Sequence, residues 1–210
     1  MIAISLVIGT ALATVATLYC RYRELRVGIY ATKMLASTGF VATALASGAA
    51  ATRPGQMMLV AFACCWLGDL LLIPRPRRYF WLGVGVFLLG HVAFAVSFVD
   101  RGIDTRWLLA SLLVLIPALN GAVVWLNPHL AGRTRAATLA YLVAISAMAA
   151  MAIGATGASG RWQLGAGALL FAASDVLVAR QRFVEPSFGN RLIGLPLYYA
   201  GQLLLALASG

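Results

Sequence analysis

The chain has 210 residues, of which 62% are hydrophobic and only 10% are charged, and its mean hydropathy is +0.90. This composition excludes an ordinary soluble globular protein and indicates an integral membrane protein. A net charge of +10 would suggest a nucleic-acid partner in a soluble protein. Here the arginines fall almost entirely in short connections between apolar runs, so we expect no nucleic-acid partner.

Apolar runs long enough to cross a bilayer, which takes about 20 residues, occur in eight places along the chain. The first run has no basic segment before it and no small-residue cleavage site, so we interpret it as a retained helix and not as a signal peptide. The connections are short and carry Pro, Gly, Asn and Arg. We predict an all-α transmembrane bundle in a single domain over residues 1–210, with helices at 2–19, 28–47, 57–73, 79–99, 107–126, 136–154, 162–179 and 192–208.

The basic residues of the connections predict the orientation of the bundle. The first, third, fifth and seventh connections hold eleven arginines, among them Arg75, and the second, fourth and sixth hold four. Because arginine and lysine concentrate on the cytoplasmic side, the odd-numbered connections are predicted to be cytoplasmic and both termini to lie on the opposite side. We expect a plasma membrane location, which in a bacterium is the inner membrane.

A short pattern occurs twice. "WLGDLLLIPRPRR" in the third helix and "AASDVLVARQR" in the seventh each read as apolar residues, a small residue, Asp, apolar residues and a basic exit. Four helices separate the two copies, as a parallel 4+4 duplication would require. We therefore consider a 4+4 parallel pseudo-repeat.

Two carboxylates, Asp69 and Asp175, lie inside apolar segments, where ionisable residues are costly and are usually kept for function. At a rise of about 1.5 Å per residue, several polar residues lie about 8–12 Å from the ends of their own helices. This shared depth predicts one polar cavity that opens to the cytoplasmic half. Its candidate residues are Lys33, Asp69, Asn120, Asp175 and Tyr199, with His91 and Gln202 nearer the midplane and Tyr198 on the same helix face as Gln202.

Each of these residues also has a structural interpretation. An ion pair between an aspartate and Lys33 would fix helix packing, and Lys33, the only lysine, could instead reach the interface. His91 could be a hydrogen-bonded core histidine, and Tyr198 and Tyr199 could be packing residues. Hydrogen bonding between helices is the simpler role for the remaining polar residues, which are Asn120, Ser37 and Ser174.

The motifs of serine hydrolases, zinc proteases and P-loop enzymes are absent from the sequence. The three cysteines have no metal-ligand spacing and are interpreted as small apolar residues. We therefore predict no metal and no cofactor. Two carboxylates in a dry polar site can divide the work, one as a protonated general acid and the other as an ionised group beside Lys33 that stabilises a cation.

At these residues the sequence resembles the YhhN/TMEM86 family of lysoplasmalogenase-like membrane proteins, from the second predicted helix to the C-terminus. The family's proline-rich context after the lysine is absent here, where the chain reads "KMLAST". The resemblance rests on "ATKMLAST", "CWLGDLLLI", "YFWLGVGVFLLGH", "GALLFAASDVLVA", Arg191 and "YYAGQLLLA", in this order.

The resemblance implies a membrane-embedded hydrolase that cleaves the vinyl-ether bond of lysoplasmalogens into a fatty aldehyde and a glycerophospho-head group. It implies that Asp69 and Asp175 are the catalytic carboxylates, with a lysophospholipid as substrate and membrane lipids around it. Lys33 and the cytoplasmic arginines would hold the phosphate. The alternatives are a proton-coupled transporter of a small molecule or lipid, and a lipid-binding protein without catalysis. No oligomeric state is predicted.

Overall fold

The described part of the chain, residues 2–74 and 76–210 of a computed structural model, contains eight α-helices and no strand. Arg75, counted above in the third connection, lies outside the described residues. Three short helical turns, η1 (Ala49–Ala51), η2 (Asn127–His129) and η3 (Arg180–Val184), join some of the helices. The helices are α1 (Ile2–Tyr22), α2 (Arg26–Ala46), α3 (Arg53–Leu71), α4 (Arg77–Asp100), α5 (Thr105–Leu126), α6 (Gly132–Ser159), α7 (Trp162–Ala179) and α8 (Phe188–Leu207).

The prediction of eight helices is confirmed, but several helices begin earlier than their apolar runs. For α3, α5 and α8 the reason is capping, because a side-chain oxygen ahead of the apolar run accepts a backbone N–H of the first helical turn. Thr52 accepts from the N–H of Gly55, and Ser187 accepts from the N–H of Gly189. The first turn of such a helix is polar, so a prediction from the hydrophobic pattern places the start of the helix too late.

Helix α6 differs most from its predicted bounds, since it continues through the segment "GATGAS" to Ser159. The glycines of this segment serve close packing: a Cβ on Gly157 would lie 2.5 Å from the ring of Trp107, and one on Gly154 would lie 2.8 Å from Ile103. The helix ends only at Gly160, whose φ of 71° is the left-handed conformation typical of a helix C-terminus.

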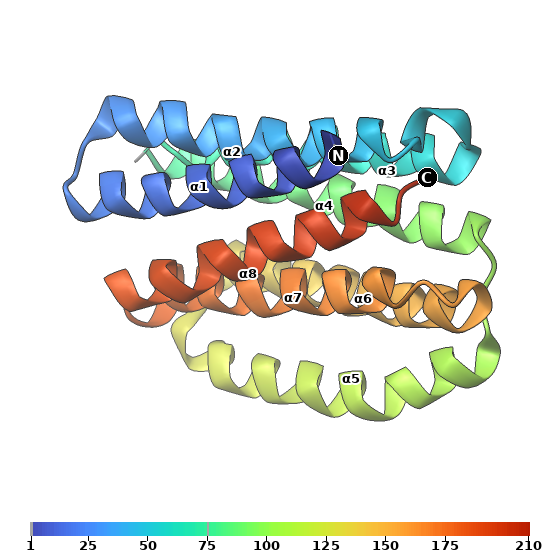
Figure 1. Cartoon of the computed structure of the whole chain (residues 1–210). Helices are drawn as coiled ribbons and strands as arrows, with labels where there is room; N and C mark the ends of the chain where they lie inside the picture. The colour runs from blue at the N-terminus through green and yellow to red at the C-terminus, as the bar shows by residue number, and fades with distance from the viewer. Residues whose placement is uncertain (1, 75) are drawn as a thin grey trace.

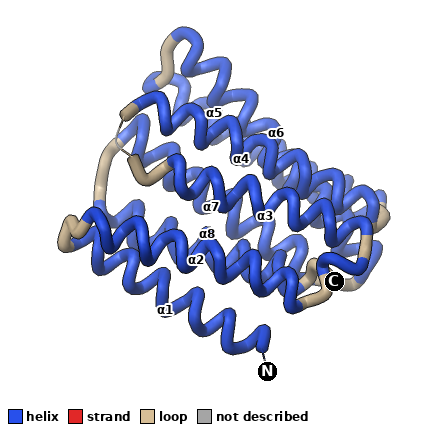
Figure 2. Tube along the Cα trace, turned by 90° about the horizontal axis from the view of Figure 1, so that it is seen from above, coloured by secondary structure: helices blue, strands red, loops and turns tan. Residues whose placement is uncertain are grey.

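The eight helices form four antiparallel hairpins that lie side by side, α1 with α2, α3 with α4, α5 with α6, and α7 with α8 (Figure 1). Helix α2 joins the hairpins by packing on both α3 and α8, and α6 packs on α4 and α7. Figure 2 shows the connections gathered at the two ends of the bundle. Helix α5 lies at one edge, packed chiefly on α6.

Within the described residues, six helices are long and apolar enough to cross a membrane, and α2 and α8 are not among them. Those two helices carry buried polar side chains, which include Lys33 and Ser37 on α2 and Gln202 on α8. The outside of the bundle is apolar, as at Leu113, which is 79% exposed. An apolar exterior around a partly polar interior is the arrangement expected of a multi-pass integral membrane protein.

Buried aromatic side chains fill the middle of the bundle. The rings of Phe40, Phe62 and Phe94 follow one another from α2 through α3 to α4, with centroids 5.6 and 5.2 Å apart. Phe171 of α7 continues this cluster and lies 5.4 Å from the ring of Tyr198 on α8. The aromatic core therefore ends against the polar residues described next.

Candidate active site

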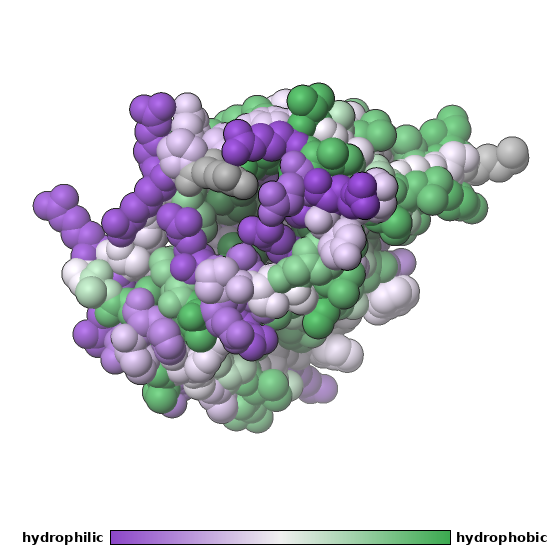
Figure 3. Space-filling model, turned by 90° about the vertical axis from the view of Figure 1, so that its left-hand side faces the viewer, coloured by the Kyte–Doolittle hydropathy of each residue, from purple (hydrophilic) through white to green (hydrophobic). Residues whose placement is uncertain are grey.

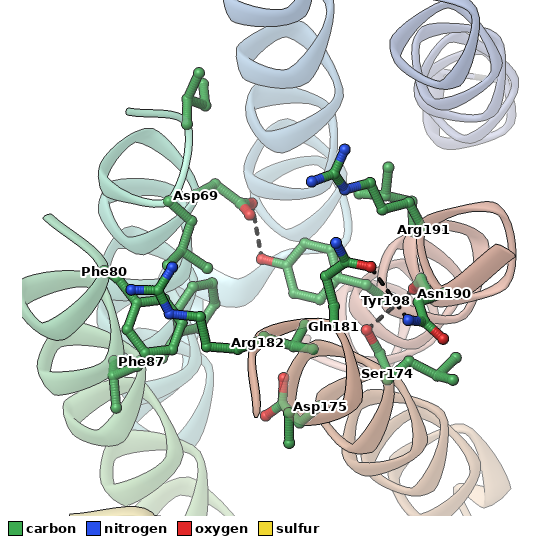
Figure 4. Close-up of a pocket in the computed structure, with 18 of the residues that line it drawn as sticks. Asp69, Phe80, Phe87, Ser174, Asp175, Gln181, Arg182, Asn190, Arg191 and Tyr198 are labelled. Carbon is green, nitrogen blue, oxygen red and sulfur yellow. Dashed lines mark hydrogen bonds between the residues drawn. The ribbon is translucent and has the colours of Figure 1, made fainter. Parts of the chain in front are cut away.

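A cavity of about 700 Å³ lies inside the bundle and is lined by residues of every helix except α5, as far as the described residues go. Figure 3 looks onto the end of the molecule that holds the odd-numbered connections, where hydrophilic side chains surround a hollow. Asp69 and Asp175 both line the cavity, on different parts of its wall (Figure 4). The structure thus brings the two carboxylates of the sequence into one site.

Asp69, near the end of α3, is 2% exposed and is held by three donors. The Nζ atom of Lys33 lies 2.9 Å from its Oδ1 atom. The hydroxyls of Ser37 and Tyr198 donate to its Oδ2 atom at 2.6 and 2.8 Å. A buried carboxylate needs such partners, and a cation with two hydroxyl donors supplies them.

Lys33 is fixed by the same group of residues. Its Nζ atom also donates to the backbone carbonyl of Asp69 at 3.0 Å, and its own carbonyl accepts from Tyr199 at 3.2 Å. The side chain is only 5% exposed, so it turns inward to Asp69 and does not reach the membrane interface. The ion pair that was one of the two interpretations of Lys33 is present.

Asp175, on α7, has a different set of neighbours. The hydroxyl of Tyr141 on α6 donates to its Oδ2 atom at 2.6 Å, and the Nε2 atom of His91 on α4 lies 3.5 Å from the same oxygen. The carboxylate side chain is 14% exposed, compared with 4% for that of Asp69. Asp175 therefore has no lysine beside it and opens further into the cavity.

The tautomer of His91 follows from its other contact. Its Nδ1 atom lies 2.7 Å from the carbonyl oxygen of Phe87, one helical turn earlier. Because a carbonyl can only accept, Nδ1 carries the hydrogen of this bond. The Nε2 atom lies 3.5 Å from Oδ2 of Asp175 and forms no hydrogen bond among the described residues. His91 therefore presents its unprotonated ring nitrogen toward Asp175 in the neutral form.

Aromatic rings separate the two carboxylates. Tyr198, whose hydroxyl points at Asp69 in Figure 4, packs its ring against Phe87 at 6.1 Å and Phe171 at 5.4 Å. His91 stacks on Phe171 as well, with ring centroids 4.7 Å apart. The two acidic groups therefore have separate polar partners and a shared apolar wall.

The other predicted residues lie at varying distances from the cavity. The hydroxyl of Tyr199 lies 3.0 Å from the hydroxyl of Ser37, which in turn donates to Asp69. Gln202 is fully buried deeper in the bundle and donates to the sulfur of Cys65 at 3.6 Å. Asn120 is exposed on α5 and is not brought into the cluster. Depth along a helix could not show that Asn120 faces outward.

Two features of the site were missed or only generally anticipated by the sequence analysis. Tyr141 was missed, although it is the only tyrosine of the sixth predicted helix and its hydroxyl needs a partner at that depth. The arginines that line the cavity were anticipated only as a group. They are Arg21, Arg26, Arg182 and Arg191, which we call the arginine rim.

The chain matches the YhhN family over residues 28–209. It is 32% identical over 149 residues to lysoplasmalogenase TMEM86A from Bos taurus, covering 68% of this chain and 60% of that protein. It is 30% identical over 161 residues to a lysoplasmalogenase from Mycobacterium bovis, covering 73% and 60%. It thus spans about 60% of the length of these relatives. No solved structure matches it. With most of its length matched by the family, the chain belongs to the YhhN family.

Proposed function

We propose that this protein is a membrane-embedded lysoplasmalogenase, which hydrolyses the vinyl-ether bond of a single-chain lysophospholipid to a fatty aldehyde and a glycerophospho-head group. The observation that carries the proposal is one cavity that holds two carboxylates with different partners, Lys33 at Asp69 and His91 at Asp175. The names of the relatives from Bos taurus and Mycobacterium bovis support the same reaction.

The two sides of the cavity differ in a way that would orient such a lipid. Asp69 lies with residues of α1, α2 and α8, the helices that carry Arg21, Arg26 and Arg191. Asp175 lies with residues of α4 and α6, which add apolar lining such as Trp81, Val84 and Leu142. A phosphate would bind on the arginine side and the alkenyl chain on the apolar side, with the ether bond between them.

Hydrolysis begins with protonation of the alkene carbon on the chain side of the ether, which gives an oxocarbenium ion. Asp175 lies on that side, with a tyrosine hydroxyl and His91 beside it and no lysine, so it is the general acid in our proposal. Asp69, paired with Lys33 and two hydroxyls, is the ionised carboxylate that stabilises the cation. Positioned acid–base groups of this kind contribute about 10²–10⁴-fold to a rate.

Water then attacks the oxocarbenium carbon and gives up one proton to Asp175, which restores the acid form. The hemiacetal that results collapses, with transfer of its hydroxyl proton to the departing glycerol oxygen. The products are one aldehyde and one alcohol, and no oxidant or reductant is consumed. The catalytic groups end in the protonation states in which they began.

The test is aldehyde release by the purified protein from a 1-alkenyl lysophospholipid in neutral detergent. The matched 1-alkyl lipid, which lacks the double bond, should give no product because it cannot be protonated at carbon. The proposal is overturned if the alkenyl lipid gives no aldehyde. It is also overturned if liposomes show lipid flux driven by a pH gradient without aldehyde, as a transporter would.

We also propose that the end that carries the arginine rim faces the cytoplasm, because basic residues concentrate at that end. In the same way we propose that the chain is a parallel 4+4 pseudo-repeat. Asp69 and Asp175 lie near the ends of α3 and α7, and each of these helices forms a hairpin with the next. The carboxylates would then be equivalent positions that acquired different partners.

A further inference from the structure

The four arginines of the rim line the cavity but have few partners within the described part of the chain. Elsewhere, Arg180 pairs with Glu185 at 3.1 Å, and Arg101 donates to the carbonyl of Ser209 at 2.6 Å. Among the described residues, no member of the rim forms an ion pair with a carboxylate. Arg182 packs its guanidinium over the ring of Phe80, 4.4 Å from the centroid.

Arg21 is the member that is hardest to explain as a surface residue. Its Nε atom is buried and has no hydrogen-bond partner among the described residues. It lines the same cavity as Arg191, a second cation, and as Asp69, which is already paired with Lys33. A desolvated cation beside a like charge is unfavourable unless an anion joins them. Figure 4 shows Arg191 reaching over the cavity above Asp69 and Tyr198.

The acidic residues of the cavity do not balance this charge. Asp69 is already paired with Lys33, and Asp175 lies on the opposite, apolar side with His91. Glu24 is the single remaining carboxylate among the described lining residues, against the four arginines of the rim. The part of the cavity that would hold a head group therefore has a clear positive excess.

We propose that the arginine rim selects lysolipids whose head group is a net anion, such as a phosphomonoester or a phosphodiester of an uncharged alcohol, over zwitterionic phosphocholine lipids. Arginine binds phosphate oxygens by paired, charge-assisted hydrogen bonds. A phosphate joined to an ammonium would bring a further cation to the side of the cavity that holds Arg21, Arg26 and Arg191, where only Glu24 could receive it. This inference rests on the proposed function, because it names the substrate class of the same cavity.

The first experiment compares kcat/KM for aldehyde release from 1-alkenyl lysophosphatidylglycerol and 1-alkenyl lysophosphatidylcholine with the same chain, in neutral detergent at low salt. We expect the anionic lipid to be favoured about tenfold, as one additional charge-assisted contact would give. The preference should shrink with added salt, because partly exposed charges are screened. Equal values, or a preference for the choline lipid, would overturn the inference without any variant being needed.

Variants then test whether the arginine rim causes the preference for the anionic lipid. Arg21→Gln and Arg191→Gln should each bring the ratio of the two kcat/KM values close to one, mainly by raising KM for the anionic lipid. Arg23→Gln is the matched control, because Arg23 follows α1 two residues after Arg21 but does not line the cavity. If Arg23→Gln changes the ratio as much as Arg21→Gln, the effect belongs to the charge of the whole surface and the inference fails.

A binding measurement separates this inference from the proposed function. Non-cleavable 1-acyl lysophosphatidylglycerol should raise the Tm of the purified protein more than 1-acyl lysophosphatidylcholine does, since a ligand that binds the folded state stabilises it. If that difference appears and no alkenyl lipid yields aldehyde, the rim assignment stands and the hydrolase proposal falls. If aldehyde forms and both acyl lipids raise Tm equally, the hydrolase stands and the rim assignment falls.

Discussion

At the scale of single residues, the two aspartates differ in what surrounds them. Asp69 has a cation 2.9 Å away and two hydroxyl donors, whereas Asp175 has a tyrosine donor and the ring nitrogen of His91. In our proposal these unlike surroundings let one carboxylate act as the acid and the other as the charged group. Variants that remove one of these contacts can therefore distinguish a structural role of Lys33 or His91 from a functional one.

Lys33→Met should destabilise the protein by about 3–5 kcal/mol, because it leaves a buried carboxylate without its cation. The double variant with Asp69→Leu should recover much of this loss, since an apolar pair removes the unpaired charge. We expect its Tm in detergent to exceed that of Lys33→Met, while aldehyde release stays absent. If the double variant retains turnover, the pair serves packing only.

His91→Gln should lower kcat by about 10²-fold and leave KM nearly unchanged, because the side chain acts through Asp175 and not on the head group. Steady-state kinetics of the folded fraction measures the two constants. Tyr141→Phe is the comparison, as it removes the other contact of Asp175 and keeps the ring. A core histidine without a positioning role would lower Tm and leave kcat of the folded protein unaltered.

At the scale of elements, the apolar pattern predicted all eight helices, although among the described residues only six of them are long and apolar enough to cross a membrane. The pattern did not predict the length of α6, where glycines that usually end a helix instead admit a ring of α5. It also could not tell which face of a helix points inward. For that reason Asp69 and Asp175 were found, since their charge is costly anywhere in lipid, but Asn120 was misplaced and Tyr141 was missed.

The close contact of α5 with α6 gives a test at this scale. Gly157→Ala should destabilise the protein by about 1–3 kcal/mol, because the added methyl group meets the ring of Trp107. Gly85→Ala on α4 is the matched control, since a Cβ there has nothing within 4 Å. Thermal unfolding in detergent should show a lower Tm for the first variant only. A Tm that rises equally in both would mean that the higher helix propensity of alanine, and not the contact with Trp107, controls the effect.

At the scale of the whole molecule, the basic residues, the opening of the cavity and the two carboxylates lie toward the same end of the bundle. The odd-numbered connections, the arginine rim and both carboxylates lie toward that end, and the apolar exterior holds the bundle in lipid. A lysolipid would keep its phosphate at this end and its chain among the helices. The orientation of the protein in the membrane therefore decides which leaflet supplies the substrate.

Labelling of single cysteines would test this orientation in bacterial cells, after the three native cysteines are replaced by alanine. Thr105→Cys, at an even-numbered connection, should react with an impermeant maleimide in intact cells. Ala131→Cys, at an odd-numbered connection, should react only after permeabilisation. Both positions are exposed, and neither substitution removes an arginine. The opposite pattern would place the rim outside the cytoplasm.

The central claim is that both carboxylates carry out the hydrolysis, and kcat for aldehyde release from a 1-alkenyl lysophospholipid tests it most directly. Asp69→Asn and Asp175→Asn should each lower kcat by at least about 10²-fold in folded, monodisperse protein. Asp100→Asn is the control, because Asp100 pairs with Arg53 outside the cavity, and it should keep wild-type kcat. Wild-type kcat in both Asp69→Asn and Asp175→Asn would contradict the account.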